Sequence, residues 1–341
     1  MILSRAPLRI SFFGGGSDLP AYYSQSDLGG SILSTAIDKY MYIALIETPK
    51  PHIKLMYSEI EIVDSISKLK HDIVQASLRH NHIERGIEIG SFADIPTMGT
   101  GLGSSSSFAV ALLNGLNCLM HGIDLHPREL AKLACTVEID LCKKPIGIQD
   151  QLAAAHGGTN YYHISQAGDV DITPIGWGDL VDLDFLNQNL MLFYTDTTRS
   201  ANEILSKQTD AMQNKVQRSL VDRMVHLTRD AYDNLIVGEY DTFGSLLDET
   251  WNNKRQLVQG ITSENFDEIY RKAKDAGALG GKLLGAGGGG YFLFYVHPEN
   301  QERVALAVGL EQMKCNINAP GAEIVYNSEE SFQVVTNTEI Y

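Results

Sequence analysis

Three clusters of glycine constrain what this chain can fold into more than any other sequence feature. Of the 31 glycines among 341 residues, 13 lie in the segments 14–16, 99–103 and 280–290. Loops that only reverse the chain direction rarely need so many. Glycines are required where the backbone adopts φ > 0 or comes close to a ligand. The clusters therefore predict three loops whose backbone contacts a ligand.

The second cluster is the most informative, because it leads directly into a helix. The residues that follow it, 108–120, are apolar nearly all round, as expected of a buried helix. Unpaired N–H groups at such a helix start form an anion site, and serine hydroxyls can bind phosphate or Mg²⁺. The alternative is a serine-rich helix cap with glycines in the turn. The candidate phosphate-binding residues are Gly99, Gly101, Leu102, Gly103, Ser104, Ser105 and Ser106.

The periodicity of the chain predicts an α+β protein. Its length favours two domains, and an irregular region at 174–188 suggests a division into 1–186 and 187–341. Strands are expected at 8–13, 40–46, 86–89, 190–194, 291–295 and 322–326. Helices are expected at 64–80, 108–120, 127–141, 151–155, 200–236, 239–258 and 299–313, with another ending at 276.

Composition and missing motifs exclude several classes of protein. Asp and Glu total 42 against 27 Lys and Arg, whereas binding to nucleic acid needs a basic surface. We expect neither a membrane span nor a secretory leader, because no long apolar run occurs. Four cysteines without C-x-x-C spacing favour reduced thiols in the cytoplasm. The chain contains neither a Walker A pattern nor the G-x-S-x-G pattern of hydrolases.

Three segments, in this order, resemble the motifs of the GHMP kinases, which include galactokinase, homoserine kinase and mevalonate kinase. The first is Ala6-Pro7-Leu8-Arg9 followed by Gly14, and the second runs from Pro96 to Ser105. The third is Lys282 to Gly290. The resemblance implies a domain similar to the second domain of ribosomal protein S5, a C-terminal ferredoxin-like domain, and a cleft that binds ATP and Mg²⁺.

The resemblance also implies catalytic and metal-binding roles. Asp150 matches the catalytic aspartate, and Arg9 the cation beside the transferred phosphoryl group. Glu138 and Ser105 match the Mg²⁺ ligands, with Ser106 as the alternative serine. From the residues alone, Asp150 could instead cap a short helix, Arg9 could be an exposed arginine, and Glu138, beside an apolar stripe, could be solvated.

Substrate-binding residues are expected near the first and third glycine clusters. Asp18, with Ser17, matches the position that binds substrate hydroxyls in the sugar kinases of the family, although an aspartate there can also cap a turn. Gly287 and Gly288 lie in the third motif. Arg199, just before a long helix, is the candidate for a distal substrate phosphate; the alternative is a solvated arginine at a helix start.

The expected substrate is a sugar or sugar phosphate. Galactokinases carry Gly-Glu-His-Thr-Asp in the first loop, where this chain has Gly14-Gly15-Gly16-Ser17-Asp18. This loop and Gly147-Ile-Gln-Asp-Gln151 resemble D-glycero-D-manno-heptose 7-phosphate kinases, which implies phosphorylation of the anomeric hydroxyl to a 1,7-bisphosphate. The alternative is a fucokinase- or galactokinase-like enzyme. A decarboxylase of the mevalonate-diphosphate type and an inactive sugar sensor are weaker alternatives, and a monomer and a homodimer both remain open.

Overall fold

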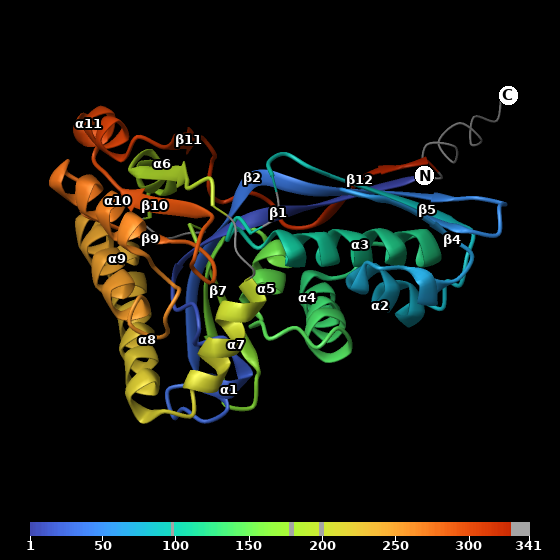
Figure 1. Ribbon diagram of the computed structural model, residues 1–341, viewed down its shortest axis with the longest axis horizontal. Coiled ribbons are helices and arrows are strands. Elements are labelled where there is room, and N and C mark those ends of the chain that lie inside the picture. Colours follow the sequence, from blue (N-terminus) through green and yellow to red (C-terminus); the bar gives the residue numbers. More distant parts are fainter. Residues whose placement is uncertain (97–98, 177–180, 198–200, 329–341) are drawn as a thin grey trace, which may run out of the picture.

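Two antiparallel-rich sheets, each covered by helices, organise the chain (Figure 1). The structure is a computed structural model that describes residues 1–96, 99–176, 181–197 and 201–328. The larger sheet has the order β12-β1-β2-β5-β3-β4, and β6 and β7 extend it from β2. Its strands are β1 (Ile2–Phe13), β2 (Gly30–Glu47), β3 (Ile53–Met56), β4 (Ile60–Val63), β5 (Ile87–Ala93), β6 (Thr159–Ile164), β7 (Val170–Ile175) and β12 (Glu323–Asn327).

Helices cover one long face of this sheet (Figure 1). The central one, α3 (Ser104–His121), packs against β1 and β2 and is buried along most of its length, as its uniformly apolar sequence predicts. Around it lie α2 (Asp72–His80), α4 (Pro127–Cys135) and α5 (Gln149–His156), together with the 3₁₀-helix η1 (Ile66–Lys68) and the π-helix η2 (Thr136–Leu141). The short α1 (Pro20–Tyr23) follows the first glycine cluster.

The second sheet has the strand order β11-β8-β10-β9. Its strands are β8 (Leu190–Tyr194), β9 (Gly280–Leu283), β10 (Tyr291–Tyr295) and β11 (Glu311–Met313). Numbered along the chain, this is the order 4-1-3-2 in a β-α-β-β-α-β succession, so the expected ferredoxin-like arrangement is confirmed. The helices are α6 (Leu183–Gln188), α7 (Ala201–Ala211), α8 (Lys215–Ile236), α9 (Tyr240–Lys254), α10 (Glu264–Asp275) and α11 (Pro298–Val308).

Several expected elements are present with different ends. The helix expected at 299–313 ends at Val308, because Gly309 takes the left-handed conformation (φ +67°) that terminates helices, and 311–313 form β11 instead. The helix expected at 200–236 is two helices, since Asn214 caps the start of α8. The last strand, β12, pairs with β1 in the first sheet. The division at 186 remains a prediction.

The C-terminal half of β1 is buried on both faces because a third apolar cluster packs against it. Leu8, Ile10 and Phe12 lie in one cluster with residues of β8, β10, α8 and α9. The ring of Phe243 on α9 meets those of Phe12 and Phe13 edge-on, with centroids 5.3 and 5.0 Å apart. This cluster fixes the ferredoxin-like half against the strand that carries Arg9.

Phe243→Ala should therefore destabilise the protein by about 3–5 kcal/mol, the usual cost of removing a buried aromatic ring. Urea unfolding followed by far-UV circular dichroism measures the change. Leu306→Ala, at a side chain that is 78% exposed, is the control and should change stability by less than about 0.5 kcal/mol. Equal unfolding midpoints for the two variants would contradict the packing role of Phe243.

Candidate active site

The three glycine loops meet at one cavity of about 280 Å³, as their clustering predicts. Arg9, Asp18 and Asp150 line it, and α7 and the end of α9 close it on the side of the second sheet. Of the predicted phosphate-binding residues, the cavity is lined by Gly99, Gly101, Gly103, Ser104, Ser105 and Ser106. Leu102 is instead fully buried, and its carbonyl accepts a hydrogen bond from the Arg9 backbone N–H at 3.0 Å.

The second and third loops touch through their backbones. Gly101 has φ +73°, and a Cβ there would lie 2.6 Å from the Leu284 carbonyl oxygen. Gly285, in turn, comes so close that its own Cβ would lie 2.5 Å from Gly101 Cα. Side chains at either position would push the loops apart. These two glycines are therefore required for the cavity to close, whatever ligand it binds.

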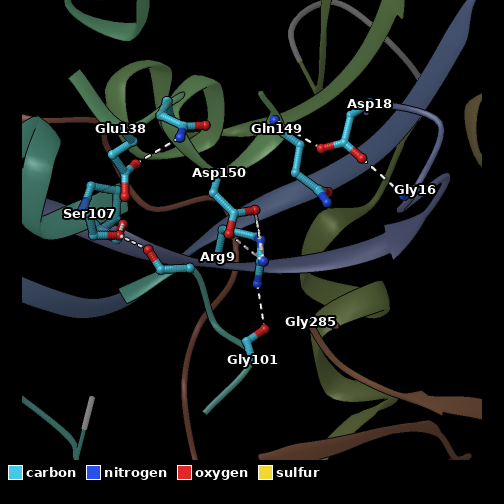
Figure 2. A network of polar contacts seen from close by, with 12 residues as sticks. Arg9, Gly16, Asp18, Gly101, Ser107, Glu138, Gln149, Asp150 and Gly285 are labelled. Carbon is cyan, nitrogen blue, oxygen red and sulfur yellow. Dashed lines mark hydrogen bonds and ion pairs between the residues drawn. The ribbon is translucent and has the colours of Figure 1, made fainter. Parts of the chain in front are cut away.

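Arg9 and Asp150, which both line the cavity, form a two-pronged ion pair (Figure 2). Arg9 Nε and Nη2 donate to the two carboxylate oxygens of Asp150, both at 2.8 Å, and Nη1 donates to the Gly101 carbonyl at 2.6 Å. Arg9 is only 3% exposed, so the exposed-arginine alternative is wrong. Asp150 lies in the first turn of α5, where Ile148 takes the cap position.

Asp18 lies to the right of Asp150 in Figure 2, beyond Gln149. Its carboxylate accepts from the backbone N–H groups of Gly16, at 2.9 Å, and Gln149, at 3.3 Å. Burial raises its pKa, the Gly16 bond opposes that rise, and the Asp150 charge adds to it. A Cβ on Gly147 would lie 1.9 Å from the Asp18 carboxylate, so the glycine at this position leaves room for it.

Glu138 is fully buried, so the alternative of a solvated position beside the apolar stripe is wrong. The residues after Cys135 continue as the π-helix η2, whose wider turn changes the facing predicted from a 3.6-residue period. One Glu138 oxygen accepts from Gln151 Nε2 at 2.7 Å. The other accepts from Ser105 Oγ at 2.8 Å and lies 3.4 Å from Lys144 Nζ. Of the two candidate serines, Ser105 is therefore the one that contacts Glu138.

Other predicted substrate-binding residues do not line the described cavity. Ser17 is buried, and its hydroxyl donates to the carbonyls of Gly14 and Ser31, bracing the first loop. Gly287 and Gly288 pack against Ile261, whose carbonyl accepts from the Gly288 N–H at 2.9 Å. Arg199 lies outside the described residues.

Comparison with protein families matches two segments of the chain, which contain the second and third glycine loops. Residues 67–158 match the GHMP kinases N terminal domain, and residues 231–315 match the GHMP kinases C terminal domain. The two matches together span about half of the chain, in the expected order. The chain is a GHMP kinase. It is therefore a phosphotransferase, and kinases of this family use ATP as the phosphate donor.

Relatives cover the kinase nearly from end to end. It is 26% identical to D-glycero-alpha-D-manno-heptose 7-phosphate kinase of Campylobacter jejuni, over 91% of this chain and 94% of the relative. An L-fucokinase/L-fucose-1-P guanylyltransferase of Bacteroides fragilis is 28% identical over 98% of this chain, which spans 38% of that protein. The solved structure of a D-glycero-D-manno-heptose 1-phosphate kinase from Bacteroides thetaiotaomicron is 25% identical, with a TM-score of 0.75, covering 96% of this chain and all of the other.

A second, larger cavity of about 910 Å³ adjoins the first in this kinase. Aromatic side chains of Tyr57, His71, Phe92 and Phe108 line it, and the rings of His71 and Phe108 stack with centroids 4.8 Å apart. The two cavities share Ser104, Ser105 and Lys144, among others, so the phosphate loop lies at their junction. None of the described helices combines the length and the apolar composition needed to cross a bilayer.

Three lysines of the site were not predicted from the sequence. Lys254, at the end of α9, lines the first cavity and donates to the Gly285 carbonyl. Lys282 is buried behind it and donates to the Phe12 carbonyl at 2.9 Å. Lys144 contacts Glu138. Lys282 begins the third motif and Lys144 follows Glu138 by six residues, but no local pattern marks Lys254, which only the tertiary fold brings to the site.

Asp150→Asn should lower kcat by ~10²–10⁴, the usual scale for a positioned acid–base group, while ATP binding is kept. The asparagine oxygen and the Gly101 carbonyl can still accept from Arg9, which preserves the loop. Steady-state assays of ADP release and calorimetric ATP titration measure the two quantities. Asp140→Asn, at an exposed aspartate, is the matched control. Turnover of Asp150→Asn close to that of Asp140→Asn would contradict the catalytic role.

Lys254 should make stability depend on pH. Burial, the largest cause, and the Arg9 charge lower its pKa from 10.5 to about 8, against the opposing effect of the Asp18 and Asp150 charges. Between these two pH values the unfolded chain holds a proton that the folded protein has lost, so stability rises with pH. Across this pH window the free energy of unfolding of the wild type should rise by up to about 3 kcal/mol relative to that of Lys254→Met. Urea unfolding at several pH values measures the difference. If the free energies of unfolding of the two proteins changed with pH in parallel, the lowered pKa of Lys254 would be contradicted.

Proposed function

We propose that this kinase phosphorylates the anomeric hydroxyl of D-glycero-D-manno-heptose 7-phosphate and forms the 1,7-bisphosphate. The observation that carries the sugar assignment is the cavity in which Asp18, held by the first loop and by Gln149, lies beside the Arg9–Asp150 pair. The end-to-end similarity to a heptose 7-phosphate kinase supports the choice of heptose.

In the proposed reaction, the acceptor hydroxyl oxygen attacks the γ-phosphorus of ATP. The bond from that phosphorus to the β-γ bridging oxygen breaks, and ADP leaves. Asp150 orients the hydroxyl and accepts its proton: a carboxylate has about four acceptor positions, of which Arg9 uses two. Arg9 fixes Asp150 and places positive charge beside the transferred group, where charge spreads over the equatorial oxygens.

We assign the nucleotide to the junction of the two cavities, with its phosphates on the N–H groups at the start of α3 and its base among the aromatic side chains. Ser105 and Glu138 fit Mg²⁺, because a hydroxyl and a fully buried carboxylate converge within 2.8 Å. Mg²⁺ usually takes one or two carboxylates together with substrate phosphates. It would neutralise the charge of the phosphate chain there.

A phosphorylated substrate needs cations at the far end of its site. Arg9 is already paired with Asp150, whereas no carboxylate among the described residues pairs with Lys254. Lys254 uses one N–H on the Gly285 carbonyl and has two further donors on the cavity wall. We therefore propose Lys254 as a ligand of the substrate phosphate, and Arg199 remains the candidate from the sequence.

The alternative function is a fucokinase- or galactokinase-like kinase acting on an unphosphorylated sugar. The similarity to the fucokinase part of the Bacteroides fragilis protein favours this alternative. The cavity argues for the heptose phosphate, because Lys254 lines it and pairs with no carboxylate among the described residues. A neutral sugar gains little from such a cation.

The substrate is tested by comparing kcat/KM for heptose 7-phosphate and free heptose. Two or three charge-assisted hydrogen bonds, each worth ~1.5–3 kcal/mol, should favour the phosphorylated sugar by at least ~10²-fold. Lys254→Met should reduce this preference, and ³¹P NMR should identify the 1,7-bisphosphate. Equal kcat/KM values, or a preference for fucose, galactose or heptose 1-phosphate, would overturn the substrate but not the kinase activity.

A further inference from the structure

Lys144 lies against the two residues assigned to Mg²⁺. Its ammonium is 3.0 Å from Ser105 Oγ and 3.4 Å from the Glu138 Oε1 that also accepts from Ser105. Its side chain is only 14% exposed, and it follows η2 in the loop that leads to α5. The same ammonium is 4.0 Å from Asp72, the first residue of α2. Lys144 thus joins the Glu138 site to a second, half-exposed carboxylate.

The charge of Glu138 requires this contact. A fully buried carboxylate is costly unless it is paired, and hydrogen bonds from neutral Gln151 and Ser105 leave its negative charge uncompensated. Among the described residues, Lys144 is the one cation in ion-pair contact with Glu138. It therefore supplies the positive charge at the position where a divalent ion would meet the same oxygens.

The position of Lys144 also gives it a second anionic partner. It lies on the wall of both cavities, at the junction to which we assign the nucleotide phosphates. A lysine side chain is a compact charge on a flexible stem with three donors, so it can exchange one oxygen partner for another by a change of rotamer. Movement away from Glu138 toward the junction would bring its ammonium onto the phosphate chain.

We propose that Lys144 is an exchangeable counter-ion, which competes with the divalent cation for Ser105 and Glu138 and binds the polyphosphate when the metal takes its place. This inference rests on the proposed function, because it uses the metal site assigned there. It assigns Lys144 two effects of opposite sign. The residue weakens binding of the metal alone, and it strengthens binding of the nucleotide.

The test measures binding rather than turnover, with Mn²⁺ as the metal probe. Electron paramagnetic resonance gives the affinity for Mn²⁺ alone, and calorimetry gives the affinity for ATP with saturating Mn²⁺ present. Lys144→Met should bind Mn²⁺ about tenfold more tightly and ATP about tenfold more weakly than the wild type, since one charge-assisted contact is lost in each case. Lys144→Arg, which keeps the charge, should stay near the wild type in both.

Lys143→Met is the matched control, because the neighbouring Lys143 is exposed and makes no contact with the site. It should leave both affinities unchanged. The proposed exchange of Lys144 would be overturned if folded Lys144→Met bound Mn²⁺ no more tightly than the wild type. It would also be overturned if the affinity for ATP were unchanged. Glu138→Gln separates this failure from failure of the metal site: if it binds Mn²⁺ with ATP as tightly as the wild type, the metal assignment itself is wrong.

Discussion

The buried ion pair of Arg9 and Asp150 is the interaction on which the active site depends. Arg9 lies on the first strand and Asp150 on α5. The third hydrogen bond of Arg9 goes to the carbonyl of Gly101, which belongs to the phosphate loop. A guanidinium with only 3% exposure tolerates this position because each of its nitrogens has an acceptor. The pair therefore sets the spacing between the phosphate loop and the acceptor side of the cavity.

The few cations of an acidic protein are concentrated around this pair. Lys254 and Lys282 are both almost completely buried, and burial lowers the pKa of each, with Arg9 and the other lysine adding to the effect at Lys282. One donor of Lys254 bonds to the Gly285 carbonyl within the ferredoxin-like half, whereas Lys282 reaches across to the Phe12 carbonyl of β1. In this cleft, Lys254 is thus placed to attract phosphate, and Lys282 helps to hold the two halves together.

The sequence indicates the fold class through its periodicity. It also indicates the glycine loops and Arg9, Glu138 and Asp150, because each of these lies within a local pattern of residues. It could not indicate Lys254, whose place depends on how α9 packs across β1. The 3.6-residue period could not predict the direction of the Glu138 side chain either, because this segment is a π-helix with an extra residue in the turn. Arg9 was ambiguous for a related reason: alternation along β1 separates two faces but does not show that helices and loops cover both.

The return of β12 to the first sheet has a consequence for how the molecule folds. β12 pairs with residues 2–5 of β1, and the Ser328 N–H reaches the Met1 carbonyl, so strands from opposite ends of the described chain are neighbours. During synthesis this edge of β1 has no partner until Glu323–Asn327 have emerged. An open strand edge can pair with other molecules. The first sheet therefore cannot be completed before residues 323–327 are made, and its β1 edge is exposed to wrong pairing until then.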